Sequence, residues 1–311
     1  MKDLRGKTAI VTGASRGLGV YIAKELAANG VNLVLAARSR EQLEETRRIC
    51  VAGGVKAIPV AADVTSLDDL RRLVATAERE FGAVDILVNN AGIELVASIA
   101  DLSIEQIDDM IRTNLNAPIW LTKLVLPSML SRRSGAIVNV ASLAGKGPVA
   151  YDGIYATTKA GLINFTQSLH LELKGTGVTA GVVCPGFVSD AGMWANHAAT
   201  GARLPWTMRE VSPARVVRGV MQAIRGKPEV LVAQPGIRPL LAIGELIPGA
   251  RLSVVDRLGV TRLFREEAER LALGEDRKRA PAPASERGEA AGEGAVAVPA
   301  PQPEQPPART E

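Results

Sequence analysis

The sequence predicts an α/β fold in which a parallel β-sheet is covered by helices on both of its faces. Between residues 7 and 89, short apolar runs alternate with longer segments of helical periodicity, a pattern typical of such a sheet. A glycine-rich turn, TGASRGLG, joins the first apolar run to the first helical segment. The chain has 311 residues, and 47% of them are hydrophobic, which is enough for one large core.

The predicted elements of the first half follow one another as strand, helix and strand. Strands are expected at residues 7–12, 31–36, 55–61 and 84–89. Helices are expected at residues 18–29, where Gly30 ends the helix, and at residues 40–52 and 67–81. Because a crossover helix returns the chain to the same edge of the sheet, consecutive strands should run parallel.

The second half continues the pattern and then departs from it. Helices are expected at residues 115–131 and 154–173, and strands at residues 136–140, 178–183 and 230–233. We therefore assign residues 1–233 to a single domain, residues 234–274 to a helical C-terminal extension and residues 275–311 to a tail. The tail is rich in proline and alanine and poor in large apolar residues, so it should be disordered.

The turn after the first strand has the composition of a phosphate-binding loop. Gly13, Gly17 and Gly19 would let the backbone approach a pyrophosphate, whose charge the free N–H groups at a helix N-terminus stabilise. The spacing differs from the G-x-G-x-x-G fingerprint, and a purely structural tight turn is the alternative. Its position directly after the first strand favours a dinucleotide and hence a Rossmann-type, doubly wound sheet.

The segment from Ser142 to Lys159 holds the side chains expected to carry chemistry. If a helix begins near Gly153, Tyr155 and Lys159 lie at i and i+4 on one face, with the ammonium beside the phenol. A nearby cation lowers the pKa of a phenol, which could then exchange a proton with an alcohol or carbonyl while Ser142 holds the same oxygen. The alternative is an exposed helical pair, but of the 3 tyrosines it is Tyr155 that has a lysine at i+4.

These motifs resemble the short-chain dehydrogenase/reductase family, in the branch marked by a TGxxxGxG turn, an NNAG segment and a Tyr-x-x-x-Lys pair. The resemblance covers roughly residues 5–232, with NNAG at residues 89–92. It implies that Asn114, Ser142, Tyr155 and Lys159 form a catalytic tetrad, without a metal. It also implies a cofactor site made of Gly13, Ser15, Arg16, Gly17, Leu18, Gly19, Arg38, Asp63, Val64, Asn90, Ala91, Gly92, Tyr155, Lys159, Pro185, Gly186 and Val188.

Several matched residues also have a purely structural interpretation. Asp63 matches the acid that meets the adenine ring, but it could instead cap a helix. Asn89 and Asn90 could pin a turn through their side chains, which is part of their role in the family. Asn114 lies in a helical stretch where asparagine is unfavourable. The resemblance implies an interrupted helix there, with a carbonyl that holds a water near Lys159, whereas the residues alone indicate a surface position.

The end of the second strand bears on the choice of nicotinamide cofactor. The position at which an acid would bind the ribose 2′-hydroxyl is Ala37, so a carboxylate is absent there. Arg38 follows it and Arg16 lies in the glycine turn, so two guanidinium groups could contact a 2′-phosphate. We therefore expect NADP(H) in preference to NAD(H). The alternative is a pair of ordinary solvent-facing arginines.

The region after the strand at residues 178–183 departs from the family in one residue. Pro185 and Gly186 match the turn beside the nicotinamide, but Asp190 stands where the family usually has a threonine that helps to bind the cofactor. An anion there would repel a pyrophosphate unless it points away. Residues 191–208 are expected to form a mobile lid, in which Trp194 and Trp206 either contact an apolar substrate or pack internally.

Composition argues against several other classes of function. The net charge is +4 and basic residues are interspersed with 33 acidic ones, so nucleic acid is not expected. Cys50 and Cys184 lie far apart without a CxxC pattern, so we expect buried, reduced thiols in a cytoplasmic protein. The chain lacks an apolar run of the ~18 residues that span a membrane, and it lacks a signal-peptide pattern. The extension is expected to cap the substrate cleft, with a subunit contact or a peripheral membrane contact through residues 237–264 as alternatives.

Together with the resemblance, these residues predict an NADP(H)-dependent oxidoreductase that interconverts a carbonyl and a secondary alcohol, with Tyr155 as the general acid or base. The substrate is expected to be apolar: a ketoacyl, steroid-like or other lipophilic carbonyl compound. The helices at residues 115–131 and 154–173 have long apolar faces, which favours a homodimer or homotetramer, as is common in the family. The alternative from another class is a nucleotide-binding scaffold or sensor without turnover.

Removal of the tail after Glu275 should leave the protein almost unchanged. Its composition cannot bury enough apolar area to offset the chain entropy lost on folding. We expect the truncated chain to have nearly the melting temperature and turnover of the full chain. A large loss of either would show that the tail docks.

Overall fold

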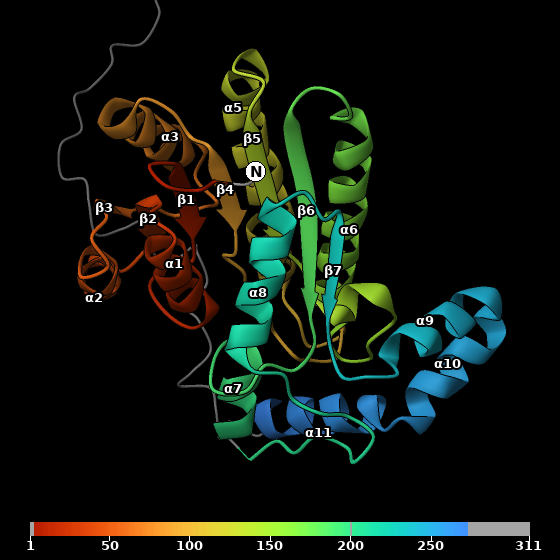
Figure 1. Ribbon diagram of the computed structural model, residues 1–311. Helices are drawn as coiled ribbons and strands as arrows, with labels where there is room; N and C mark the ends of the chain where they lie inside the picture. The colour runs from red at the N-terminus through yellow and green to blue at the C-terminus, as the bar shows by residue number, and fades with distance from the viewer. Residues whose placement is uncertain (1–2, 200, 273–311) are drawn as a thin grey trace, which may run out of the picture. The chain divides into compact units, whose positions relative to one another are not determined.

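The central sheet consists of strands that all run parallel. The computed structural model describes residues 3–199 and 201–272, and in this part of the chain seven strands lie in the order β3-β2-β1-β4-β5-β6-β7. The strands are β1 (Thr8–Thr12), β2 (Asn32–Ala37), β3 (Ala57–Ala61), β4 (Ile86–Asn89), β5 (Gly135–Val140), β6 (Val178–Pro185) and β7 (Glu229–Val232). All six neighbouring pairs are parallel. The predicted α/β fold with a doubly wound parallel sheet is confirmed (Figure 1).

The strand order reverses between β1 and β4. From β1 the chain moves outwards to β2 and β3, and it then returns to place β4 to β7 on the other side of β1. The two central strands pair in register, with Ile10 opposite Leu87 and Val11 opposite Val88. At such a switch point the connections leave in opposite directions and open a crevice at the carboxyl ends of the strands, where ligands bind in open α/β sheets.

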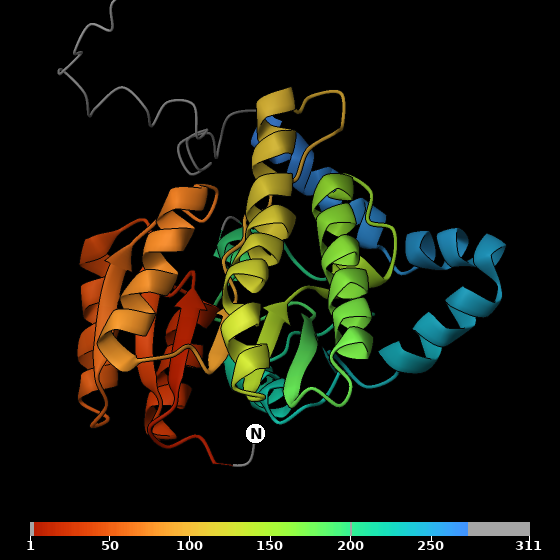
Figure 2. The same ribbon diagram turned by 90° about the horizontal axis from the view of Figure 1, so that it is seen from above.

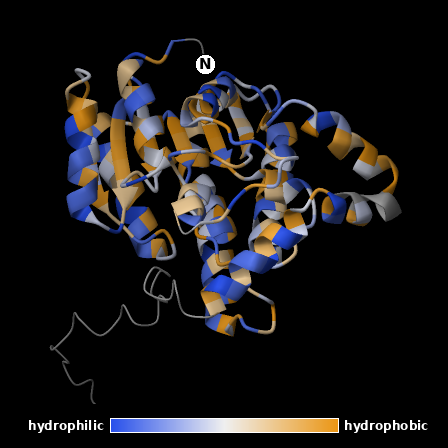
Figure 3. Ribbon diagram, turned by 90° about the horizontal axis from the view of Figure 1, so that it is seen from below, coloured by the Kyte–Doolittle hydropathy of each residue, from blue (hydrophilic) through white to orange (hydrophobic). Residues whose placement is uncertain are grey.

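Helices cover both faces of the sheet (Figure 2). One face carries α1 (Leu18–Ala28), α2 (Arg40–Val51) and α8 (Pro213–Ile224), and the other carries α3 (Leu67–Phe81), α5 (Ala117–Ser131) and α6 (Gly153–Glu172). Every residue of β1, β4 and β5 is buried, as expected for strands packed on both faces. Figure 3 shows this contrast as hydrophobic strands between helices of mixed hydropathy.

Outside the predicted lid, two helices were missed in the sequence, although both carry start signals. The first, α4 (Ile104–Ile111), begins after Ser103, whose side chain and that of Gln106 form a reciprocal capping box. The second, α8, begins with Pro213 directly after Ser212. The helix predicted from residue 115 instead begins with a π-helical turn at Arg112–Asn116, and α5 follows that turn.

The described part of the C-terminal extension is helical, and its last helix packs beside the lid region. It contains α9 (Ile237–Leu246), α10 (Pro248–Arg257) and α11 (Val260–Ala272). Figure 1 shows α11 next to α7 (Met193–Ala199), at the end of the sheet toward which the strand arrows point, while α9 and α10 lie to one side. An apolar cluster joins Leu263 and Phe264 of α11 to Trp194 of α7 and to Val96 of the segment after β4. The extension therefore contributes to the cover over the carboxyl ends of the strands.

The cysteine prediction is confirmed, because Cys50 and Cys184 are both buried, free thiols. Burial raises the pKa of the Cys50 thiol to about 11 and that of Cys184 to about 12, so both remain unreactive at neutral pH. Among residues 3–199 and 201–272, no helix is both long enough and apolar enough to cross a membrane. The predicted tail, residues 275–311, lies outside the described residues.

Candidate active site

The glycine-rich turn lies at the carboxyl end of β1, where the backbone is tightly packed. A Cβ atom on Gly19 would lie 2.0 Å from the carbonyl oxygen of Gly13, and one on Gly13 would lie 2.9 Å from Cα of Ala91. Gly17 occupies the N-cap position of α1 with φ 57°, so it offers no side chain to the free N–H groups of the helix. The first turn of α1 also lacks an acidic residue. A helix N-terminus without a side-chain cap fits a phosphate group.

The NNAG turn is fixed to β1 by hydrogen bonds. The Thr12 hydroxyl accepts from the N–H groups of Asn90 and Ala91 at 3.0 and 3.1 Å. Asn90 Nδ2 donates to the carbonyl oxygen of Thr12 at 3.0 Å, and Asn89 Nδ2 donates to Oδ1 of Asn139 at 2.8 Å. The two asparagine side chains therefore pin the turn, and Ala91 and Gly92 follow directly at the switch point.

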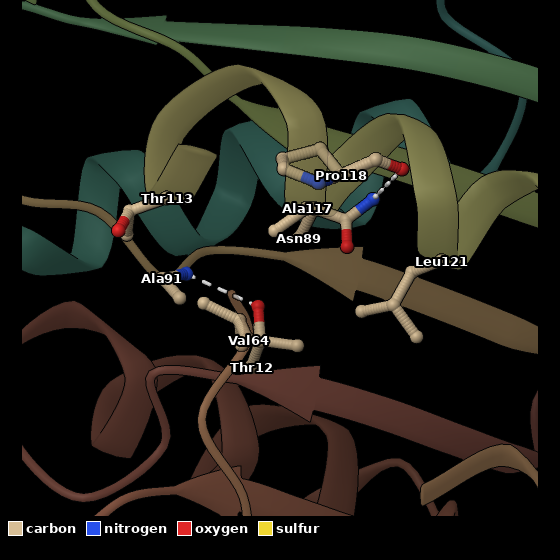
Figure 4. A pocket seen from close by; sticks show the side chains of 8 residues that line it. All are labelled: Thr12, Val64, Asn89, Ala91, Thr113, Ala117, Pro118 and Leu121. Carbon is tan, nitrogen blue, oxygen red and sulfur yellow. Dashed lines mark hydrogen bonds between the residues drawn. The ribbon is translucent and has the colours of Figure 1, made fainter. Parts of the chain in front are cut away.

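A small hollow lies behind this turn (Figure 4). It is lined by Thr12, Val64, Asn89, Ala91, Thr113, Ala117, Pro118 and Leu121. Asn89 Nδ2 also approaches the carbonyl oxygen of Pro118 at 3.4 Å, so this polar side chain ties β4 to α5. Val64 and Ala91 are both predicted to contact the cofactor. Val64 follows β3 and Ala91 follows β4, and both line the hollow. The hollow thus brings together two of the predicted cofactor residues.

The structure removes one alternative for Asp63 and leaves the predicted roles of the arginines open. Oδ1 of Asp63 accepts from the backbone N–H and the hydroxyl of Thr65 at 2.9 and 2.7 Å. Ser66, not Asp63, caps α3, so the helix-cap interpretation of Asp63 is wrong. Arg16 in the turn and Arg38 after β2 are both exposed. Arg16 follows β1 and Arg38 follows β2. Both therefore lie at the carboxyl ends of the strands, where the glycine turn also lies.

Tyr155, Lys159 and Ser142 converge from α6 and the end of β5. Tyr155 and Lys159 are 7% and 3% exposed, so the interpretation of an exposed helical pair is wrong. Lys159 Nζ lies 5.5 Å from the centre of the Tyr155 ring and donates to the carbonyl oxygen of Val140 at 3.2 Å. Ser142 accepts from the N–H of Ala144 at 3.1 Å and is hydrogen-bonded to the Tyr155 hydroxyl.

The pKa of Tyr155 moves in the direction opposite to the one that the Tyr-x-x-x-Lys spacing predicts. Burial raises it well above its usual value, the charges of Glu94 and Asp152 raise it further, and the hydrogen bond with Ser142 lowers it less. Burial also lowers the pKa of Lys159 to about 8, against the charge of Glu94. The predicted lowering of the pKa of Tyr155 is therefore not found in this arrangement, because the prediction considered the cation and not the buried setting. In this arrangement Tyr155 is a neutral phenol at pH 7.

Asn114 lies in the π-helical turn before α5 and is fully buried, so the surface interpretation is wrong. Its side chain accepts from the N–H of Ile93 at 2.8 Å and donates to the carbonyl oxygen of Ile93 at 2.8 Å. It also donates to the Thr158 hydroxyl at 3.2 Å, which connects it to α6. A Cβ on Gly92 would lie 3.2 Å from Oδ1 of Asn114 and 3.4 Å from Nζ of Lys159. These two predicted catalytic residues therefore meet at the NNAG turn, and the helix is interrupted as the resemblance implied.

The turn after β6 carries the remaining predicted cofactor residues. The N–H of Gly186 donates to the carbonyl oxygen of Val232 at 2.8 Å, and Val188 is buried and bridged to Val211. Asp190 is exposed and adopts a left-handed backbone conformation, with φ 57°. Its carboxylate is therefore accessible to solvent, which reduces its repulsion of a nearby phosphate.

The predicted lid is partly helical, and its two tryptophans differ. Trp194 on α7 is buried, packs edge to face against Phe187 with ring centres 5.0 Å apart, and donates from Nε1 to Glu210 at 2.6 Å. Trp206 is 92% exposed. Internal packing is thus the interpretation that holds for Trp194. The mobility of residues 191–208 stays a prediction.

Sequence reasoning missed a set of charged side chains on the other side of Tyr155. His197 on α7 lies between two carboxylates, with Nδ1 2.8 Å from Glu267 of α11 and Nε2 3.1 Å from Glu94. Glu267 is also paired with Arg270. A neutral imidazole has one donor and one acceptor nitrogen, so two carboxylate partners favour the imidazolium. The sequence separations are 70 and 103 residues, so spacing alone does not reveal this contact.

The imidazolium of His197 should make stability depend on pH. Burial alone would lower the pKa of His197, but its bonds to Glu267 and Glu94 and their charges raise it from 6.5 to about 9. This stabilisation is therefore complete below pH ~6.5 and is lost as the pH rises through about 9. At Glu267, burial would raise the pKa, but His197 and Arg270 lower it below 4.5. The stabilisation from the Glu267 carboxylate is therefore lost only as the pH falls below 4.5.

We expect His197→Gln to lower the melting temperature most between about pH 4.5 and 6.5 and hardly at all above about pH 9.5. The rise in the pKa of His197 from 6.5 to about 9 corresponds to a contribution of at most about 3 kcal/mol to the free energy of unfolding. Thermal unfolding of both proteins across this pH range is the measurement. A difference in melting temperature that stays constant with pH would contradict the prediction.

The chain matches a protein family and several of its relatives in sequence. The family model described as short chain dehydrogenase matches residues 7–201. A ketoacyl reductase, HetN from Nostoc sp. (strain PCC 7120), is 42% identical over 275 residues, which cover 86% of this chain and 95% of that protein. An uncharacterized oxidoreductase from Staphylococcus aureus (strain USA300) is 33% identical over 240 residues, with 77% of this chain and 100% of that protein covered.

Solved structures with the same fold have been determined with a phosphorylated nicotinamide cofactor. A metagenomic short-chain oxidoreductase in complex with NADP superposes with a TM-score of 0.64 at 31% identity, covering 74% of this chain and 98% of that one. A point variant of actinorhodin polyketide ketoreductase with NADPH superposes with a TM-score of 0.68 at 34% identity, covering 73% and 95%.

The fold and the arrangement of its polar groups define a nicotinamide-dependent oxidoreductase with a Rossmann-type sheet. The chain belongs to the short-chain dehydrogenase/reductase family.

Proposed function

We propose that the protein is an NADP(H)-dependent reductase of ketoacyl or similar lipophilic carbonyl compounds, with Tyr155 as the proton donor. One observation carries the proposal: Ser142, Tyr155 and Lys159 are brought together beside Asn114 and the NNAG turn, at the end of the sheet that bears the glycine turn. A scaffold that only binds a nucleotide has no physical need for a buried phenol, hydroxyl and ammonium in contact.

The protonation states suit the reduction of a carbonyl. Because the pKa of Tyr155 is raised, its hydroxyl is protonated at pH 7 and can donate to an oxygen that gains negative charge. Ser142 can hold the same oxygen through its hydroxyl. Lys159, with a pKa of about 8, is mainly cationic at pH 7 and favours the phenolate that Tyr155 leaves after it donates.

The chain offers a site that fits a phosphorylated dinucleotide. The uncapped N-terminus of α1 would hold the pyrophosphate, and Ala37 at the end of β2 leaves room for a 2′-phosphate where other chains of this fold have an acid. Arg16 and Arg38 would pair with that phosphate. When bound, the nicotinamide supplies the hydride. Two solved relatives with NADP or NADPH support this preference.

The proposed substrate class rests on the cover formed by α7 and α11. This cover contains an apolar cluster of Val96, Trp194, Val260, Leu263, Phe264 and Ala268, with Val149 and Tyr151 packed against it. The match to the ketoacyl reductase covers 86% of the chain, which is more than residues 1–233 could provide. The extension is therefore part of what the two proteins share, and we infer that it shapes the substrate side of the cleft.

A substrate panel tests the proposal. We expect the absorbance of NADPH to fall when the full chain is mixed with β-ketoacyl thioesters, and to fall more slowly with short, polar ketones of equal reactivity. The same panel with NADH should be slower throughout. Tight binding of NADPH without any oxidation across ketoacyl, steroid and simple ketone substrates would contradict the proposal and favour a nucleotide-binding scaffold.

A further inference from the structure

Asp152 occupies the N-cap position of α6 but its side chain does not cap the helix. The residue is 2% exposed, and neither of its carboxylate oxygens meets a hydrogen-bond donor among the described residues. A buried carboxylate without donors is unfavourable by several kcal/mol in general, so a group in this position takes up a proton or finds a partner.

The segment that carries Glu94 lies beside Asp152, because the N–H of Ala97 donates to the carbonyl oxygen of Tyr151 at 2.8 Å, and the carboxyl of Glu94 is the neighbour of the Asp152 carboxyl. Two carboxyl groups bond to each other only when one of them is protonated. Burial first, and then the charge and the hydrogen bond of Glu94, raise the pKa of Asp152 well above its usual value. Within the described residues, no group of three or more acidic, His and Cys side chains is arranged to hold a metal ion.

Glu94 is itself fixed from the opposite side. Its Oε2 accepts from Nε2 of His197 at 3.1 Å, and its side chain is 10% exposed. The titratable and charged groups around the pair come from three helices. They are Tyr155 and Lys159 on α6, His197 on α7, and Glu267 and Arg270 on α11.

We propose that Glu94 and Asp152 share a single proton beside Tyr155, and that this carboxyl pair, held in place by His197, is a positioning element that keeps Tyr155 in its proton-donating form. With one proton, the pair carries one negative charge close to the phenol. That charge opposes the formation of phenolate and offsets the ammonium of Lys159, which favours it. Glu94 and Asp152 thus act through Tyr155 and need not touch the substrate.

This inference rests on the proposed role of Tyr155 as proton donor, but its first test needs no turnover. We expect the infrared spectrum of the full chain at pH 7 to contain the carbonyl stretch of a protonated carboxyl group that shifts in heavy water. Asp152→Asn and Glu94→Gln should each remove it, because an amide can donate to the remaining carboxylate. Absence of the band from the wild-type protein, or its persistence in both variants, would overturn the shared proton.

Asp85→Asn is the matched control for that measurement. Asp85 is also buried, but it accepts from the N–H of Thr8 and from Arg132 at the other end of the sheet. The control should therefore keep the infrared band even if it unfolds more easily. Loss of the band in this variant as well would mean that the band reports general destabilisation and not the pair.

A pH profile separates positioning from a merely structural role. In the double variant Asp152→Asn/Glu94→Gln, the negative charge of the pair near Tyr155 is gone, so its phenol should ionise at lower pH. The alkaline limit of single-turnover reduction should then move to lower pH by about one unit or more. Tyrosinate absorbance, measured against the same variant with Tyr155→Phe, should show the same shift without substrate. A uniform fall in rate with an unmoved limit and an unmoved tyrosinate titration would overturn the positioning role.

If the protein proves to have another activity, the infrared and tyrosinate results still decide this inference. If the pair shares no proton but ketoacyl reduction is found, the proposed function stands and the positioning role fails.

Discussion

Replacing Tyr155 by phenylalanine should lower turnover by ~10²- to 10⁴-fold, which is the range that general acid catalysis contributes. Phenylalanine has nearly the same shape as tyrosine and lacks the hydroxyl. Tyr155 is 7% exposed and its ring packs in the core, so the variant should keep the fold and the affinity for the cofactor. Single-turnover hydride transfer with saturating NADPH measures the effect on chemistry apart from binding.

Tyr151→Phe is the matched control, because it makes the same chemical change four residues earlier. Tyr151 packs with the apolar cluster under α11 and has Arg265 5.9 Å from its ring centre. It takes no part in the hydrogen bonds of Ser142 or Lys159, so the transfer rate should change little. Lys159→Met should lower the rate and also weaken the cofactor, since this lysine approaches the NNAG turn. A near-normal rate in Tyr155→Phe would mean that the proton comes from another group.

Features that depend on local sequence could be predicted. The helix at Leu67–Phe81 has its predicted bounds, because Ser66 caps its start and Gly82, in a left-handed conformation, ends it. The position of the glycine turn between β1 and α1 follows from the same local signals. Once parallel strands are predicted, the ends of neighbouring strands must meet at one edge of the sheet. The NNAG turn and Ser142 follow the neighbouring strands β4 and β5, so this geometry agrees with the site that the family resemblance implied.

Features that depend on distant contacts could not be predicted from the residues alone. Asn114 stands in a helical stretch, and only a π-helical turn and contacts with Ile93 and Thr158 bury it. Asp152 has the residue type and position of an ordinary helix cap, yet its carboxyl meets Glu94 instead. The direction of the pKa of Tyr155 depends on that burial and on those two acids. The spacing of four residues between Tyr155 and Lys159 contains no information about the burial of Tyr155 or about the two acids beside it.

Removing both Arg16 and Arg38 should reverse the preference for NADPH. A hydrogen bond between charged groups contributes about 1.5–3 kcal/mol, so the loss of two such contacts should weaken NADPH by about 10²- to 10⁴-fold. NADH lacks the 2′-phosphate, so its affinity should change by less than about tenfold. Titration of each cofactor into Arg16→Ala, Arg38→Ala and the double variant gives the individual and combined effects.

Arg48→Ala is the control, because Arg48 is exposed near the last turn of α2, at the far end of the helix that follows Arg38. It should leave the affinity for both cofactors unchanged. The preference should also weaken with salt in the wild-type protein, because exposed charges are screened over a Debye length of about 8 Å at physiological ionic strength. The double variant should have lost this salt dependence. Equal affinity of the wild-type protein for NADH and NADPH at low salt would show that neither arginine contacts a 2′-phosphate, whatever the variants do.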